Sequence, residues 1–252
     1  MTNVDFSRKT MDSISIIIPT YNEEQNIAEN LRLLRDYLET IPYDYEIITV
    51  DDGSDDSTCA KIEEATTSIS PKIRLIINKV NQGKGAVVKQ GVLSAKGHYI
   101  FFTDADLPYN LSFIKLGLEK LQQGVEMVAG SRYETTTGKK TSPFQIRTLS
   151  SKVFRTIAHI LIKTKAHDTQ CGFKGFTRDV AILLFSRSII NGFGFDIEIL
   201  FLANKFNVKI ANLPVFYSGA ERESRVKVIK DSLKILLETV SVLVNNNTGR
   251  YS

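Results

Sequence analysis

The chain has 252 residues, of which 42% are hydrophobic and 24% charged, a composition typical of a globular protein with enough apolar material for one large α/β domain. Its 32 basic and 28 acidic residues leave a net charge of +4, which does not indicate a nucleic-acid partner. The two cysteines, Cys59 and Cys171, lie far apart, so we expect reduced thiols in a cytosolic chain and no zinc site. The N-terminal residues lack the apolar segment of a signal peptide, and no run approaches the ~20 apolar residues that span a bilayer.

Strand-like and helix-like patterns alternate in the first half of the chain. Strands are predicted over 13–18, 45–50, 72–78, 98–103 and 125–130, and Pro19 is expected to end the first of them. Helices are predicted between them over 23–40, 57–68, 83–95 and 110–123. The first helix has one apolar face, formed by Ile27, Leu31, Leu34 and Leu38. Such alternation predicts an α/β fold with a mostly parallel sheet and helices on both faces.

The second half has a different pattern. Residues 139–165 contain seven Lys or Arg and no Asp or Glu, with apolar residues at near-helical spacing. This composition favours an amphipathic helix on a membrane surface over one packed against the sheet. A strand over 208–217 and a helix after Arg225 are predicted next. The last helix has an apolar stripe, for which packing within the domain or an oligomer contact is favoured; it comprises Ile229, Leu233, Leu236, Leu237, Val240, Leu243 and Val244.

Acidic residues follow two of the predicted strands. Asp51 and Asp52 end the second strand, and Asp104 and Asp106 follow the fourth. Ligands of parallel α/β sheets bind outside the carboxyl ends of the strands, so both pairs are expected at the ligand site. An Asp-x-Asp there is typical of a Mg²⁺ or Mn²⁺ site on a diphosphate, with a solvated turn as the alternative. For Asp51 and Asp52, nucleotide contacts and turn chemistry both remain open.

A glycine-rich segment precedes the third predicted helix. It is not a P-loop, because GxxxxGK[ST] is absent, but Lys84 lies at a helix N-terminus, where it can face an anion. A Rossmann dehydrogenase is disfavoured because no GxGxxG follows the first strand.

Five motifs occur in order along the first half: SIIIPTYNEEQNI, VDDGSDDST, NQGKGAVVKQG, TDADLP and AGSRY. As a set they closely resemble glycosyltransferase family 2, the inverting enzymes with the Rossmann-like GT-A fold. In the second half, DTQCGFKGFTR, GFGFDIEIL and ERESRVKV are similar to polyprenyl-phosphate hexosyltransferases, especially the dolichyl-phosphate β-glucosyltransferase type. The resemblance implies an enzyme that transfers a hexose, with UDP-glucose favoured as donor, to polyprenyl or dolichyl phosphate in β linkage.

The resemblance also implies a role for each matching position. The nucleotide-sugar pocket would be formed by Pro19, Tyr21, Glu23, Asp52, Lys84 and Asp104. Asp104 and Asp106 would hold the Mg²⁺ or Mn²⁺ cofactor. The catalytic residues would be Asp104, Asp106, Arg132 and Asp196. Acceptor and phosphate binding would fall to Arg132, Arg147, Arg222 and Arg225. For Asp196, capping of the following helix is the alternative.

The sequence departs from the family pattern at two places. The family often has Gly-Ser-Lys where this chain has Glu-Ser-Arg at 223–225, and often has Trp before the Phe-Asp pair at 195–196, whereas this chain contains no Trp. Three alternatives therefore stay open: a GDP-mannose-dependent mannosyltransferase, a family 2 enzyme with a glycan acceptor, and a nucleotide-sugar-binding module without turnover.

The expected organisation is a GT-A domain over 12–220, divided into a nucleotide-binding half over 12–132 and an acceptor and membrane-surface half over 133–220. A phosphate-binding loop and an amphipathic helix are expected over 221–252. We expect a peripheral protein on the cytoplasmic face of a membrane, and homo-oligomer formation is left open.

Overall fold

A computed structural model describes residues 12–132, 164, 166–216 and 228–251, with the side chains of 228–233 left out. Its strands are β1 (Ser13–Thr20), β2 (Asp44–Asp51), β3 (Ile73–Ile77), β4 (Tyr99–Phe102), β5 (Met127–Ser131), β6 (Lys174–Thr177) and β7 (Ile210–Pro214). Its helices are α1 (Ile27–Glu39), α2 (Thr58–Ser68), α3 (Lys84–Ser94), α4 (Ser112–Gln122), α6 (Arg178–Arg187), α7 (Phe195–Lys205) and α8 (Val228–Asn247).

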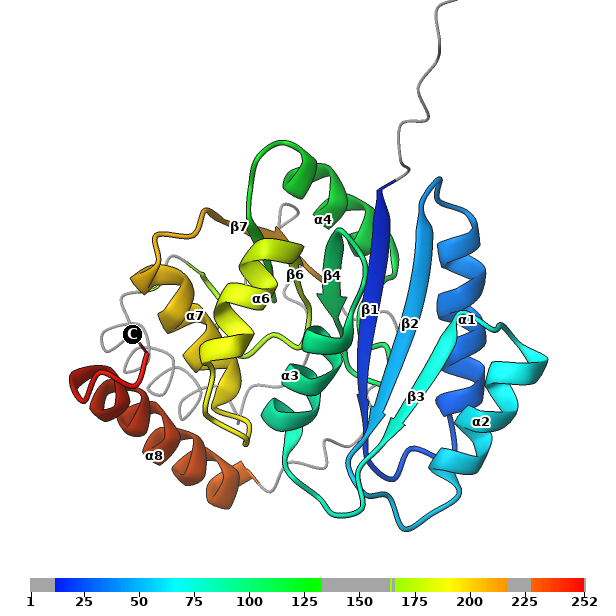
Figure 1. The fold of residues 1–252 in the computed structure, drawn as a ribbon, viewed down its shortest axis with the longest axis horizontal. Helices are drawn as coiled ribbons and strands as arrows, with labels where there is room; N and C mark the ends of the chain where they lie inside the picture. The colour runs from blue at the N-terminus through cyan, green and yellow to red at the C-terminus, as the bar shows by residue number, and fades with distance from the viewer. Residues whose placement is uncertain (1–11, 133–163, 165, 217–227, 252) are drawn as a thin grey trace, which may run out of the picture.

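The strands form one sheet in the order β3-β2-β1-β4-β6-β5-β7 (Figure 1). All neighbouring pairs are parallel except those of β6, which runs antiparallel to both β4 and β5. Lys174, the first residue of β6, pairs with Phe102 at the end of β4 and with Ala129 of β5. An antiparallel strand begins where its neighbours end, so the start of β6 lies at the carboxyl edge of the sheet, where ligands of such sheets bind.

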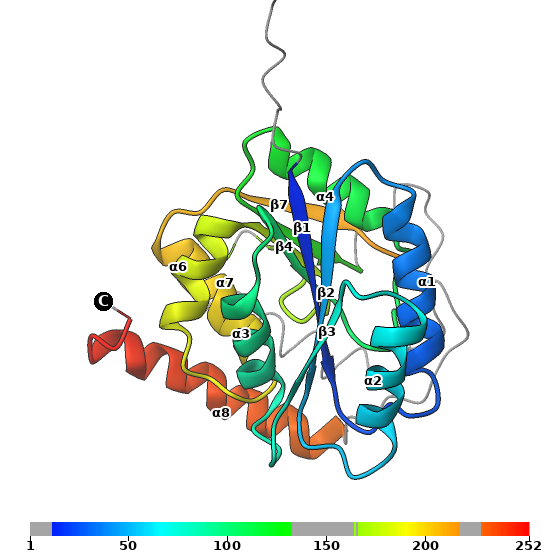
Figure 2. The same cartoon turned by 45° about the vertical axis from the view of Figure 1, so that its right-hand side comes forward.

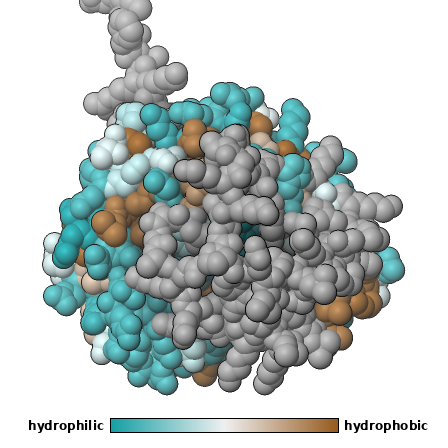
Figure 3. Space-filling view, turned by 180° about the vertical axis from the view of Figure 1, so that it is seen from behind, coloured by the Kyte–Doolittle hydropathy of each residue, from teal (hydrophilic) through white to brown (hydrophobic). Residues whose placement is uncertain are grey.

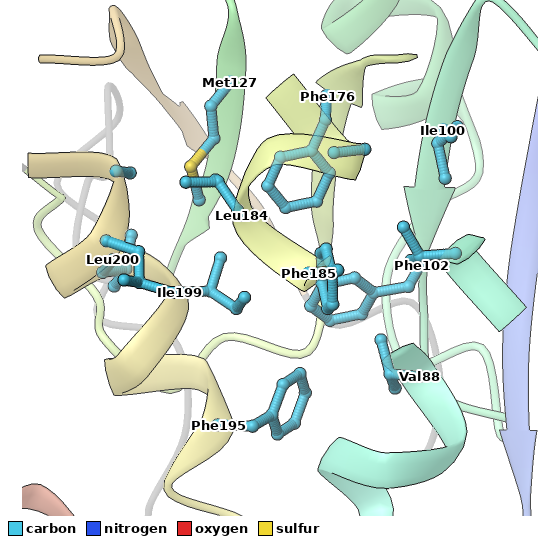
Figure 4. Close-up of a cluster of buried hydrophobic side chains, with 14 of the residues drawn as sticks. Val88, Ile100, Phe102, Met127, Phe176, Leu184, Phe185, Phe195, Ile199 and Leu200 are labelled. Carbon is cyan, nitrogen blue, oxygen red and sulfur yellow. The ribbon is translucent and has the colours of Figure 1, made fainter. Parts of the chain in front are cut away.

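Two hydrophobic cores lie on the two faces of the sheet. Helices α1, α2 and α4 cover one face, and α3, α6 and α7 cover the other, with α8 beyond them (Figures 1 and 2). The second core is rich in aromatic rings, and Phe102 of β4 lies 5.7 Å from Phe195 of α7 between ring centroids (Figure 4). Aromatic packing therefore ties the end of β4 to the start of α7.

The predicted alternation of the first half is confirmed, and the four predicted apolar residues of α1 are all buried. The prediction that Pro19 ends the first strand is wrong: β1 continues to Thr20, and Pro19 stays in register with Val50 of β2. Proline lacks only the N–H group, so its carbonyl can still take part in a strand. Neither β6 nor α6 was predicted.

The prediction of one apolar stripe on α8 is wrong in part. Ile235, Thr239 and Val242 are buried and face the core, whereas Leu237, Val240 and Val244 are exposed at 61%, 47% and 55%. None of the three buried residues belongs to the predicted stripe, so the helix packs on the core with a different face. The packing within the domain that was favoured for the stripe is therefore wrong for Leu237, Val240 and Val244, and the alternative of an oligomer contact stays a prediction.

The visible surface of the described residues is mostly hydrophilic when the molecule is seen from behind, with separate hydrophobic patches (Figure 3). Within the described ranges, no helix is both long and apolar enough to cross a bilayer. The basic segment 139–165 lies outside the described residues, so the prediction of a membrane-surface helix there stays a prediction.

Candidate active site

Hydrogen bonds from backbone amides after β1 to side-chain hydroxyls after β2 join these two segments. The amide of Asn22 donates to Ser54 Oγ (2.9 Å), and the amide of Glu23 donates to Thr58 Oγ1 (2.7 Å). Asn22 has a left-handed backbone, with φ of 54°, which Asn tolerates better than most residues. These bonds hold the Tyr21–Glu23 turn against the acidic loop. Tyr21 itself is 45% exposed.

The acidic loop after β2 is largely satisfied from within. Asp51 is fully buried and accepts hydrogen bonds from the amide (2.8 Å) and hydroxyl (2.5 Å) of Ser54. Asp52 is 4% exposed and accepts from the amides of Gln82 (2.7 Å) and Gly83 (3.0 Å). Turn chemistry thus accounts for Asp51, while Asp52 fastens the loop that leads into α3. Burial raises the pKa of Asp52, and the two amides partly oppose that shift.

Lys84 and Asp104 form an ion pair at the carboxyl edge of the sheet, with Nζ 2.5 Å from Oδ1. Lys84 opens α3 directly after Gly83, whose φ of 99° suits only glycine, and Asp104 follows β4. Burial lowers the pKa of Lys84, but the neighbouring carboxylates of Asp104 and Asp196 more than offset this and raise it. Lys84 is therefore a protonated cation among carboxylates.

Gly172 lies against the same carboxylate. A Cβ atom added to Gly172 would be 2.1 Å from Asp104 Oδ2, far inside contact distance. The segment that leads into β6 thus approaches Asp104 so closely that no other residue fits without moving that carboxylate. Asp106, which lies two residues after Asp104 in the chain, is exposed.

Asp196 lies in the first turn of α7 and is paired with Lys174, which starts β6. Both side chains are almost fully removed from solvent: 8% of the Asp196 side chain and 0% of the Lys174 side chain is exposed. Lys174 Nζ also donates to the carbonyl of Cys171 (2.8 Å). Burial raises the pKa of Asp196, and the positive charges of Lys174 and Lys84 oppose that shift. The alternative of a helix cap for Asp196 is wrong, since Gly194 holds the cap position and no side chain caps the helix.

Arg132, which follows β5, is clamped by Asp168. Its Nε lies 2.6 Å from Asp168 Oδ2, and its NH2 donates to Oδ1 over 3.0 Å, a bidentate geometry. Asp168 is 2% exposed, whereas 29% of the Arg132 side chain remains exposed to solvent. Burial would raise the pKa of Asp168, but the guanidinium holds it below its usual value. No role was predicted for Asp168, although it opens the DTQCGF motif.

The predicted site residues thus divide into groups. Pro19, Tyr21, Glu23 and Asp52 lie in or next to the joined loops after β1 and β2. Lys84, Asp104 and Asp196 interact with one another. Arg147, Arg222 and Arg225 lie outside the described residues. Lys174, Asp168 and Gly172 were missed, because their importance depends on β6 running antiparallel, which its four residues do not reveal.

A divalent cation fits the carboxylates after β4. Within the described part of the chain, no group of three or more His, Cys, Asp or Glu forms a complete metal cage. Mg²⁺ is usually bound by one or two carboxylates together with substrate phosphates, and Asp104 and Asp106 supply that donor set. Gly172 keeps the Asp104 carboxylate from being crowded.

These features define a class of protein: a glycosyltransferase of the GT-A type, with carboxylates at the carboxyl edge of a mostly parallel sheet. The chain belongs to glycosyl transferase family 2, and the model of that family matches residues 15–185.

Among curated proteins, the chain is similar to the dolichyl-phosphate beta-glucosyltransferase of Dictyostelium discoideum, with 34% identity over 88% of this chain and 73% of the relative. It is 32% identical to the human protein of the same name over 82% of this chain and 68% of the relative. The Saccharomyces cerevisiae protein of that name is 30% identical over 94% of this chain and 76% of the relative.

Solved structures confirm the fold. Glucosyl-3-phosphoglycerate synthase from Mycobacterium tuberculosis in complex with UDP has a TM-score of 0.68 and 18% identity, covering 92% of this chain and 80% of that one. The complex of the same protein with Mn²⁺, UDP and glucosyl-3-phosphoglycerate has a TM-score of 0.65 and 17% identity, with coverage of 93% and 79%.

Proposed function

We propose that this glycosyltransferase moves glucose from UDP-glucose to dolichyl phosphate or another polyprenyl phosphate, with inversion to a β-linked lipid-phosphate sugar. The observation that carries this proposal is the similarity to dolichyl-phosphate beta-glucosyltransferases along most of the chain. The UDP donor is supported further by the related fold whose structure was solved with UDP.

The donor diphosphate would bind where Lys84, Asp104 and Asp106 meet. Mg²⁺ or Mn²⁺ held by the two carboxylates would neutralise charge that develops on the departing diphosphate. Lys84, whose ammonium group lies beside the Asp104 carboxylate, would contact the diphosphate. Together with the metal, it would stabilise the leaving group, which is the main electrostatic requirement of glycosyl transfer.

The acceptor requires little activation. A lipid phosphate is already anionic at neutral pH, so no strong general base is needed to deprotonate it. The pairing of Asp196 with Lys174 agrees with this, since that carboxylate has a cation partner. We assign Arg132 to the reaction centre as a fixed cation whose orientation Asp168 sets, and we assign Pro19, Tyr21, Glu23 and Asp52 to the nucleotide pocket.

The test is a transfer assay with purified protein, radiolabelled nucleotide sugars, a short polyprenyl phosphate, and either Mg²⁺ or EDTA. Label should pass from UDP-glucose into the organic phase only with metal. Transfer from GDP-mannose instead would overturn the donor assignment, and intact protein that labels no lipid from any donor would overturn the acceptor assignment.

A matched pair of variants tests the metal role. Asp106→Asn is expected to abolish transfer without unfolding the protein, whereas Asp55→Asn, an exposed acid of the other loop, should retain it. Normal turnover by Asp106→Asn would refute the role of Asp106 as a metal ligand.

We further propose that the protein acts at the cytoplasmic face of a membrane, because its acceptor is a lipid. The basic composition of 139–165 supports this, since each cation near an anionic lipid surface contributes about 1 kcal/mol. Neutralising Lys152 and Arg155 should weaken binding to vesicles that contain anionic lipid. Unchanged binding would exclude this segment as the contact.

A further inference from the structure

Two ion pairs, which we call the charged row, lie close together at the proposed donor site. Lys174 pairs with Asp196, and Lys84 pairs with Asp104. The start of α3 packs against the start of α7, because a Cβ atom added to Gly85 would be 2.6 Å from Phe195 Cβ. Lys84 and Asp196, the chain neighbours of these two residues, are therefore close, and the negative charge of Asp196 acts on Lys84. The direct ion-pair partner of Lys84 is Asp104.

Lys174 is an unusual residue for its position. Its side chain is fully buried, and a lone ammonium group is costly to remove from water unless it is paired. Its described partners are the Asp196 carboxylate, the Cys171 carbonyl at 2.8 Å, and the ring of Phe102, whose centroid lies 5.4 Å from Nζ. The buried lysine thus has one anionic partner, and that partner is Asp196.

The position of Lys174 follows from the direction of β6. Because β6 is antiparallel, its first residue lies between the last residue of β4 and the middle of β5. The Asp196 carboxylate reaches Lys174 from the first turn of α7. Two segments that are distant in the sequence thus bring opposite charges together close to Lys84.

Lys84 is the other described cation whose charge acts on Asp196, so without Lys174 it would be the cation left to satisfy that carboxylate. A buried carboxylate that loses its partner is strongly destabilised, and it recovers part of that free energy by attracting another cation. Lys84 would then be drawn inward to Asp196 and away from the proposed diphosphate site.

We propose that Lys174 is a positioning residue: by neutralising Asp196, it leaves Lys84 available to bind the donor diphosphate. This inference rests on the proposed function, because it takes a nucleoside diphosphate as the ligand of Lys84. Lys174 itself contacts no substrate and acts through Asp196.

The experiment measures the affinity of the folded protein for UDP with Mn²⁺ by calorimetry, and its stability by urea unfolding. Lys174→Met should weaken UDP binding by about tenfold, the equivalent of roughly 1.4 kcal/mol, because Lys84 is diverted to Asp196. Lys174→Met combined with Asp196→Asn should restore UDP affinity to near the wild-type value, because the competing carboxylate has been neutralised.

The combined variant also keeps the test decisive if Lys174→Met folds poorly. Replacing both members of a buried ion pair is commonly much less harmful than removing one, so the combined variant should be the more stable of the two. Its wild-type-like UDP affinity would support the inference, whereas UDP affinity that stays low in this folded variant would overturn it.

Lys89→Met is the matched control. Lys89 lies on the same helix, α3, and donates to the carbonyl of Ser188 (2.7 Å), away from the charged row. Its loss should lower stability without changing UDP affinity. Equal UDP affinity of Lys174→Met and wild type would overturn the inference alone, whereas failure of the wild type to bind UDP with Mn²⁺ would count against the proposed function.

Discussion

Replacing Gly172 by alanine tests whether the carboxylate of Asp104 is the part of the site that binds the metal. The added methyl carbon would lie 2.1 Å from Asp104 Oδ2 and 2.7 Å from its Cγ. Ordinary contacts begin at 3.4 Å, so the carboxylate oxygen must move by about 3.4 − 2.1 = 1.3 Å.

A displacement of that size matters more for binding than for folding. Metal–oxygen distances for Mg²⁺ are about 2.0–2.1 Å and tolerate little variation, so a shift of this size removes the oxygen from the coordination shell. Disturbing the surroundings of a metal ligand typically lowers affinity or activity about 10–100-fold. The cost to stability should be near the lower end of the roughly 1–3 kcal/mol for overpacking, because a side-chain end moves and the backbone does not.

The assay titrates UDP in the presence of Mn²⁺ and, in parallel, follows urea unfolding. Gly117→Ala is the control: its methyl carbon would lie 2.8 Å from the ring of Phe101, a clash between α4 and β4 in the hydrophobic core. Gly117→Ala should change stability only, whereas Gly172→Ala should change UDP binding far more than stability. A folded Gly172→Ala variant that binds Mn²⁺-UDP as tightly as wild type would refute the assignment of Asp104.

Three further predictions concern groups around the site. Arg132→Met should lower the free energy of unfolding by about 3 kcal/mol at neutral pH, because it leaves the buried carboxylate of Asp168 unpaired. The pKa of Asp168 is depressed in the folded protein, so this deficit should shrink in urea titrations as the pH falls through that pKa; a pH-independent deficit would contradict the pairing. Burial raises the pKa of Cys59 to about 12 and of Cys171 to about 11, so iodoacetamide at pH 7.5 should label them only after denaturation, and rapid labelling of native protein would be inconsistent with these shifts. Tyr251→Phe removes a 2.6 Å hydrogen bond to a buried glutamate and should cost about 1–2 kcal/mol in thermal unfolding, and an unchanged melting temperature would argue against that bond.

The sequence predicted the part of the fold that follows a simple rule. Strands and helices that alternate up to β5 have the periodicities expected of buried strands and amphipathic helices. They place Asp52 after β2 and Asp104 after β4, the two strands on either side of β1. Strand β6 escapes this reasoning because it is short, contains Gly175, and begins with a buried lysine. Glycine and lysine are both uncommon in central strands.

Charge pairing was the second limit on prediction from sequence. Arg132 and Asp168 are separated by 36 residues, and Lys174 and Asp196 by 22. No periodicity links such positions, so only the fold reveals that each basic residue has an acidic partner. Arg132 was predicted as a phosphate ligand from the motif, yet the bidentate contact with Asp168 fixes its orientation in the protein itself.

The two acidic loops, which look alike in the sequence, have different surroundings in the structure. Asp51 accepts a hydrogen bond from the main chain of its own loop and Asp52 from the loop before α3, which stabilises the carboxylates and orders both loops. Asp104 instead faces a lysine ammonium group and a glycine without a side chain. Under the proposed function, Asp104 would hold the metal ion and Lys84 would contact the diphosphate, which a side-chain ion pair permits because it can separate without any change in the main chain. Main-chain amides cannot be displaced without opening their loop, so the loop after β2 is the one suited to hold its shape.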